Sequence, residues 1–99
     1  MNQKNFAKLQ GRAETAASLL KLLGNETRLQ ILCQLIDGEK PVTEIETNLQ
    51  LGQSAVSQHL SILRRGRVVK TRREAQRIYY SLASPEAAQM LNTLSEIYC

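Results

Sequence analysis

The spacing of apolar residues changes period along this chain, and that change constrains the fold more than any other feature. From Phe6 to Leu63, apolar side chains recur at three- and four-residue steps, the repeat of helices with one buried face. Between Val68 and Leu82 two runs of β-branched and aromatic residues show alternation, which is typical of a β-hairpin. Beyond this hairpin the helical repeat returns. The sequence therefore predicts a mainly α fold of four helices, a two-stranded hairpin and a C-terminal helix.

Turn and capping residues set the expected boundaries. A first helix is expected to run to about Leu23 and to end at Gly24, and Asn25 is suited to cap a second helix. Thr43 and Glu46 have the spacing of a capping box, which predicts the start of a short third helix. Breaks are expected at Asp37-Gly38 and Leu51-Gly52, and Ser84 is expected to cap the last helix, with Pro85 at its first position.

The elements are expected to form one domain over residues 1–99. A chain of this size buries only roughly 60–70% of its unfolded surface. Apolar stripes on both the first and the last helix therefore favour a homodimer. The side chains expected to face inward, in chain order, are Phe6, Leu9, Ala13, Ala16, Leu20 and Leu23; Leu29, Leu32, Cys33 and Ile36; Ile45 and Leu49; Val56, Leu60 and Leu63; Ile78, Tyr80 and Leu82; and Ala87, Leu91, Leu94 and Tyr98.

Several function classes are excluded by what the chain lacks. No apolar run approaches the ~18–20 residues of a membrane span, and the start MNQKNFAKLQ lacks the apolar segment of a secretory signal. A cytoplasmic protein without membrane contact is expected. The sequence has no glycine-rich phosphate loop, paired catalytic carboxylates or nucleophile with a base, so it predicts neither an enzyme nor a cofactor.

Positive charge is concentrated in one segment. Residues 1–63 hold six basic and six acidic side chains, whereas residues 64–80 hold seven basic side chains against Glu74 alone. A solvated surface is the simplest explanation of a charged run, but six of the seven are arginines, whose guanidinium groups bind oxyanions bidentately. The segment therefore favours nucleic acid as the partner. These cations are Arg64, Arg65, Arg67, Lys70, Arg72, Arg73 and Arg77.

The fourth predicted helix is the candidate for reading DNA bases. It exposes small hydrogen-bonding side chains opposite its apolar stripe, and such side chains reach base edges in a major groove. The hairpin that follows would meet flanking phosphates or a minor groove. The residues expected to contact double-stranded DNA are Gln53, Ser54, Ser57, Gln58, His59, Arg64, Arg65, Arg72, Arg73, Gln76 and Arg77.

Three segments carry a resemblance to a known family. They read LGNETRLQILCQL, VTEIETNLQLGQSAVSQHLSILRR and VVKTRREAQRIYYSL. Over about residues 10–99 the chain resembles the ArsR/SmtB family of dimeric bacterial winged-helix repressors. The resemblance implies a winged helix-turn-helix, an operator as partner, and first and last helices at a dimer interface.

The same resemblance implies how the protein senses its effector. Family metal sites need a Cys-x-Cys cluster in the third helix or His and carboxylate ligands in the last, and neither set is present, so no metal is expected. Cys33 and Cys99 match the cysteine pair of the sulfide- and redox-responsive branch, in which reactive sulfur species bridge the pair and weaken operator binding. From the residues alone, Cys33 on an apolar stripe reads as a small core residue.

Two alternative functions stay open, and the sequence departs from the family pattern at one point. The alternatives are a metal-responsive repressor of the same fold and a constitutive basic nucleic-acid-binding domain without a sensor. The departure is that family members commonly have Asp-Gly-Leu before the wing, where this chain has Gly66-Arg67-Val68. Either Arg67 adopts a positive φ at some cost, or the helix cap shifts by one residue.

Overall fold

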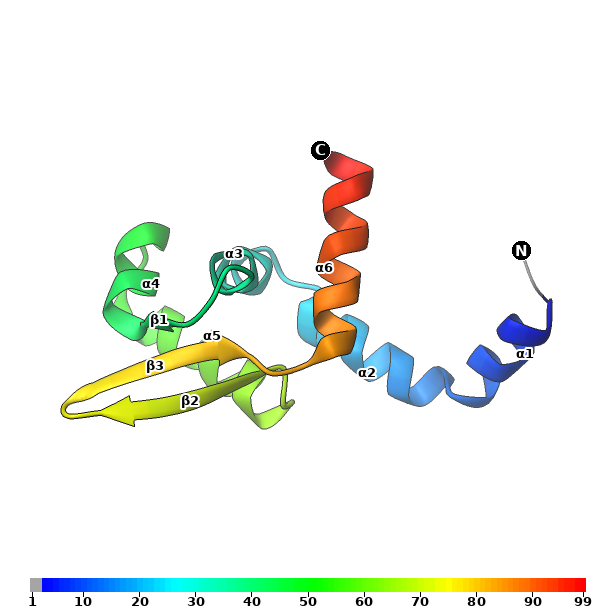
Figure 1. Ribbon diagram of the computed structural model, residues 1–99, viewed down its shortest axis with the longest axis horizontal. Helices are drawn as coiled ribbons and strands as arrows, with labels where there is room; N and C mark the ends of the chain where they lie inside the picture. The colour runs from blue at the N-terminus through cyan, green and yellow to red at the C-terminus, as the bar shows by residue number, and fades with distance from the viewer. Residues whose placement is uncertain (1–2) are drawn as a thin grey trace.

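The computed structural model describes residues 3–99, which form six helices and three short strands (Figure 1). Strands β2 and β3 extend to one side, α1 and α2 trail to the other, and α6 carries the C-terminus away from the body. None of the helices in residues 3–99 is long and apolar enough to cross a bilayer. The elements are α1 (Gln3–Gly11), α2 (Ala13–Leu23), α3 (Glu26–Leu35), β1 (Lys40–Pro41), α4 (Val42–Leu49), α5 (Gln53–Arg65), β2 (Val69–Glu74), β3 (Arg77–Leu82) and α6 (Pro85–Tyr98).

The first predicted helix is in fact two. Arg12, with φ −120° and ψ 21°, lies outside helical geometry and separates α1 from α2. The break keeps its backbone bonds, because the Arg12 N–H donates to Leu9 O and Arg12 O accepts from Ala16 N. The predicted stripe of this segment is mostly exposed, and only Leu23 of it is buried.

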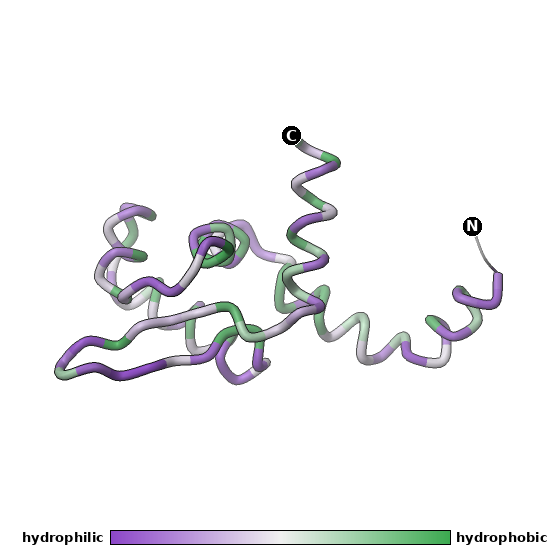
Figure 2. Tube along the Cα trace, viewed as in Figure 1, coloured by the Kyte–Doolittle hydropathy of each residue, from purple (hydrophilic) through white to green (hydrophobic). Residues whose placement is uncertain are grey.

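The hairpin belongs to a three-stranded antiparallel sheet in the order β1-β3-β2, which corrects the two-stranded prediction. Lys40 and Pro41 of β1 pair with Tyr80 and Tyr79 of β3. A two-residue strand leaves no alternating pattern to detect, and Pro41 lies at the sheet edge, where its missing N–H costs no ladder bond. The β2–β3 hairpin, residues 69–82, is called the wing from here on, and its outer part is mostly hydrophilic (Figure 2).

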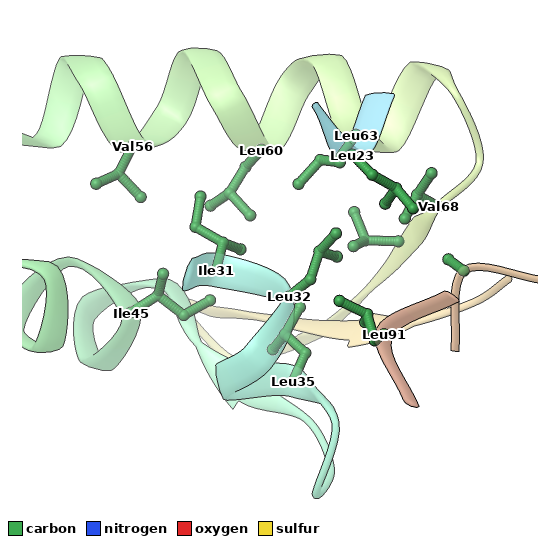
Figure 3. Packing of buried hydrophobic residues seen from close by; sticks show 12 residues of the cluster. Leu23, Ile31, Leu32, Leu35, Ile45, Val56, Leu60, Leu63, Val68 and Leu91 are labelled. Carbon is green, nitrogen blue, oxygen red and sulfur yellow. The ribbon is translucent and has the colours of Figure 1, made fainter. Parts of the chain in front are cut away.

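One hydrophobic core joins α2, α3, α4, α5, β2 and α6. Side chains of Val56 and Leu60 on α5 point toward Ile31 on α3 (Figure 3). Burying one such side chain contributes about 1.5–3 kcal/mol, so this contact fixes α5 on the body. The buried set is Leu23, Ile31, Leu32, Leu35, Ile45, Val56, Leu60, Leu63, Val68, Val69, Ala87 and Leu91.

The burial of α3 differs from the prediction. Ile31, Leu32 and Leu35 are buried, whereas Cys33 is exposed and Ile36 is 41% exposed. Two apolar stripes with helical spacing overlap at Leu32, and the repeat alone does not say which one faces the core. Two further predicted inward residues, Ile78 (37% exposed) and Tyr98 (80% exposed), also lie on the surface because each is at the outer end of its element.

Two of the three predicted helix caps are confirmed. Asn25 Oδ1 accepts from Arg28 N at 3.1 Å, and Ser84 Oγ accepts from Ala87 N at 3.0 Å. The capping box at Thr43 is wrong, because α4 begins directly after β1 and Thr43 is already inside the helix. Glu46 Oε1 is consequently buried without a hydrogen-bond partner.

The junction between α5 and β2 takes the first of the two open alternatives. Arg67 has φ +61°, and the bonds Arg67 N to Arg64 O and Val68 N to Leu63 O form a Schellman cap. Gly66, at φ −79°, is needed for a different reason: a Cβ there would lie 2.5 Å from Leu22 Cδ1. With glycine fixed at 66 by packing, the left-handed position falls on Arg67, at a cost of roughly 1–2 kcal/mol.

Candidate nucleic-acid interface

Helix α5 presents two different faces. Val56, Leu60 and Leu63 are buried, and the opposite side carries exposed polar side chains. The helix starts after extended Gly52 without a side-chain cap, so the amide groups of its first turn are not occupied by a capping side chain. Of the residues predicted to read bases, Gln53, Ser54, Ser57 and Gln58 are exposed, and His59 is half-buried.

His59 is held by a residue that the sequence did not single out for this purpose. Arg28 Nε donates to Leu22 O at 2.7 Å and its Nη2 donates to Lys21 O at 3.1 Å, so it closes the end of α2. Its Nη1 lies 3.5 Å from His59 Nδ1. Because a guanidinium only donates, the arrangement fits a His59 tautomer with its proton on Nε2. Arg28 thereby links α2 and α3 to the predicted reading helix.

Arg72 differs from the other cations of the wing. Its Nε lies 3.1 Å from Glu39 Oε2 and its Nη2 contacts Glu39 Oε1, while Nη1 lies 2.8 Å from Glu74 Oε2. Its guanidinium also stacks 4.6 Å from the centre of the Tyr79 ring. The hydrogen bond from Arg72 lowers the pKa of Glu39, and the hydrogen bonds to Glu39 and Glu74 raise the pKa of Arg72. We call this bidentate Glu39–Arg72 contact the clasp.

The remaining residues predicted to contact DNA lie at the end of α5 and near the tip of the wing. Arg64 and Arg65 are exposed in the last turn of α5, and Arg73, Gln76 and Arg77 are exposed near the tip of the wing. Successive residues of a strand point to opposite faces, so Arg72 and Arg73 project from different sides of β2. The polar face of α5 and the cationic wing follow one another directly in the chain, joined by the junction at residues 66–68.

Both cysteines are free and exposed. Cys33 lines an open groove of about 880 Å³ between α3 and the end of α4, together with Leu29, Gln34 and Asn48. Cys99 follows the last turn of α6, where its N–H donates to Ser95 O at 2.9 Å. The prediction that Cys33 faces the core is therefore wrong. Within residues 3–99 no three His, Cys, Asp or Glu side chains are grouped to hold a metal ion.

Comparisons with known proteins show which protein family has this arrangement of helices and wing. The model for "Bacterial regulatory protein, arsR family" matches residues 25–71. The Transcriptional activator HlyU of Vibrio cholerae is 46% identical over 95 residues, covering 96% of this chain and 88% of its own. The chain belongs to the arsR family. The Biofilm growth-associated repressor of Xylella fastidiosa is 41% identical over 91 residues, covering 92% of this chain and 80% of its own.

Solved structures of arsR-family proteins agree in fold. Reduced HlyU from Vibrio cholerae matches with a TM-score of 0.87 and 47% identity, covering 93% of this chain and 97% of its own. The transcriptional repressor BigR from Xylella fastidiosa matches with a TM-score of 0.89 and 39% identity over 100% of this chain and 98% of its own. The winged helix-turn-helix is therefore confirmed. This arsR-family chain is a DNA-binding transcription regulator and not an enzyme.

Proposed function

We propose that the chain is a homodimeric repressor whose operator affinity falls when reactive sulfur species bridge Cys33 and Cys99. The observation that carries the proposal is the exposure of both thiols, because sulfur transfer needs an accessible thiolate. A polysulfide supplies the sulfur and the oxidising equivalents. Each thiolate attacks a sulfur next to one end of the polysulfide, forms one S–S bond, breaks another and releases hydrosulfide.

The bridge would act through the two helices that it joins. Cys33 lies on α3, which is packed against α5, and Cys99 ends α6. Tying α3 to α6 would shift the two α5 helices of a dimer away from consecutive major grooves. Loss of operator binding switches on genes that a bound repressor keeps silent. The operator is DNA, which places the proposed activity in the cytoplasm.

Base contacts are proposed for the exposed face of α5, through Gln53, Ser54, Ser57, Gln58 and His59. We expect Ser57→Ala and Gln58→Ala each to weaken operator binding by about 1–3 kcal/mol, with little effect on random DNA, because base-edge bonds carry the sequence information. Titration of both DNAs at one salt concentration measures this. Asn92→Ala, an exposed change on α6, serves as the control. An equal loss on both DNAs would show that α5 does not read the bases.

Phosphate contacts are proposed for Arg64, Arg65, Arg73, Gln76 and Arg77, with Arg72 positioning the wing through the clasp. We expect Arg73→Gln to lower the slope of log affinity against log salt by about 1.8, because the homodimer loses one phosphate contact in each copy. Arg72→Gln should change this slope little, but should speed amide hydrogen exchange in the wing because Glu39 no longer holds it. Identical slope losses in both variants would contradict the division of roles.

The clasp also has an expected pH dependence. Because the pKa of Glu39 is lowered in the folded protein, the clasp is intact above the ordinary pKa of a glutamate and is lost as the pH falls through the lowered value. We therefore expect Glu39→Gln at neutral pH to reproduce the faster exchange of Arg72→Gln.

A further inference from the structure

Three cations surround a shallow hollow where α5 meets the wing. Arg64, Arg67 and Lys70 line it, and its volume is about 350 Å³. Its other walls are Val69, Thr71 and Ala83, so no acidic side chain lines it. Within residues 3–99, the three cations form no ion pair. Since like charges at close quarters repel, an anion is the occupant that would offset this repulsion.

The backbone under the hollow is fixed. The Schellman bonds hold residues 63–68, and Ala83 N donates to Val68 O at 2.8 Å, which ties the two sides of the junction together. Val68 and Val69 are 1% and 2% exposed and anchor the start of β2 in the core. The cations therefore project from a rigid base, and an anion bound there need not order a mobile loop.

Arg67 adds a second, independent observation. It occupies a left-handed position that glycine would adopt without strain, whereas the glycine of this junction is at position 66, where a Cβ would meet the side chain of Leu22. Non-glycine residues in left-handed conformations cluster at functional sites, and Arg67 combines this conformation with a cationic side chain that lines the hollow. The Schellman bonds hold the backbone of Arg67 at the edge of the hollow that its side chain lines.

We propose that this hollow binds a phosphodiester of the DNA backbone, with Arg67 and Lys70 acting beside Arg64. The proposal rests on the DNA-binding function and adds two residues that the sequence placed in the cationic segment but not among the expected DNA contacts. Arginine and lysine both bind phosphate oxygens, arginine through its planar fork and lysine as a point charge. Free inorganic phosphate has the same chemistry, so the experiment separates the two sources.

The decisive variant is Arg67→Gly, because the proposal predicts opposite signs for two measurements. Relief of strain, offset in part by the greater conformational freedom of glycine in the unfolded chain, should raise Tm by about 2–5 °C. Loss of one phosphate contact in each copy of the homodimer should lower the slope of log affinity against log salt by about 1.8, equally on operator and random DNA. Arg67→Lys should keep the slope and gain no Tm. Lys70→Gln should lower the slope without raising Tm, and Lys21→Gln, an exposed cation on α2 away from the hollow, should change neither.

A rise in Tm for Arg67→Gly with an unchanged slope would overturn the proposal and leave Arg67 as a cap residue only. The same variant should still prefer operator over random DNA, whereas absence of any such preference in the unaltered protein would instead overturn the proposed function. Inorganic phosphate, titrated while the amide signals of Arg67 and Thr71 are followed by NMR, is expected to shift them weakly without saturation. Saturation together with an unchanged slope would assign the hollow to the free anion.

Discussion

Ile97→Glu is expected to turn the protein into monomers and to lower operator affinity by about 10³-fold or more, toward that for random DNA. Ile97 is 64% exposed on α6, and Leu20 on α2 is 54% exposed, so neither residue has an apolar partner that covers it within one copy. Hydrophobic residues continue along α6 toward the C-terminus (Figure 2). In the proposed homodimer a second copy covers these residues, and a buried unpaired carboxylate is strongly unfavourable.

Sedimentation equilibrium measures the change of mass, and titration of operator DNA measures the affinity. Asn92→Glu is the matched control, because it adds the same charge at an exposed polar position of the same helix. Leu94→Glu tests the same stripe, but Leu94 is half-buried in the chain itself, so its loss of binding could follow from unfolding. A dimer of undiminished operator affinity in Ile97→Glu would contradict the homodimer.

The second large effect is expected from the cysteines. Cys33→Ser and Cys99→Ser should each bind the operator normally under reducing conditions and lose the response to sodium tetrasulfide. In the unaltered protein tetrasulfide should release the DNA. A direct disulfide requires Cα atoms about 4.4–6.8 Å apart, whereas a chain of added sulfur atoms spans a longer gap. If the two Cα atoms lie beyond this disulfide range, hydrogen peroxide is expected to release DNA less effectively than tetrasulfide does.

Mass spectrometry of the treated protein provides the direct measurement. A peptide pair joined through Cys33 and Cys99 with added sulfur is expected, and reduction should restore both the free thiols and the DNA binding. The proposed thiol switch would be contradicted if the double Ser variant still lost operator affinity on tetrasulfide treatment. A treated protein that lacks any link between these two residues would contradict it as well.

Much of the surface that we propose for DNA binding was predictable, because its sequence signals are local. The polar face of α5 follows from the spacing of Val56, Leu60 and Leu63, all of which are buried as predicted. The wing follows from the alternation in residues 68–82. The partners of individual cations were not predictable. The sequence treats the seven basic residues of 64–80 alike, whereas in the structure Arg72 binds Glu39 and Arg67 lines a hollow.

The sequence by itself determined the features that arise within one or two helical turns. Asn25 and Ser84 cap helices because each bonds to an amide three residues away, and no distant residue takes part. The apolar repeat of α5 likewise needs only its own residues. For these elements the local sequence is compatible with only one local structure.

Where the local sequence was compatible with two or more local structures, only the tertiary structure decided between them. Packing against α5 chose which stripe of α3 is buried and left Cys33 exposed. The contact of Leu22 with Gly66 put the left-handed conformation on Arg67, and Glu39 reached Arg72 across 33 positions of sequence. The physical reason is common to all three: each depends on a partner far away in the chain, whose position exists only once the helices and the sheet have packed.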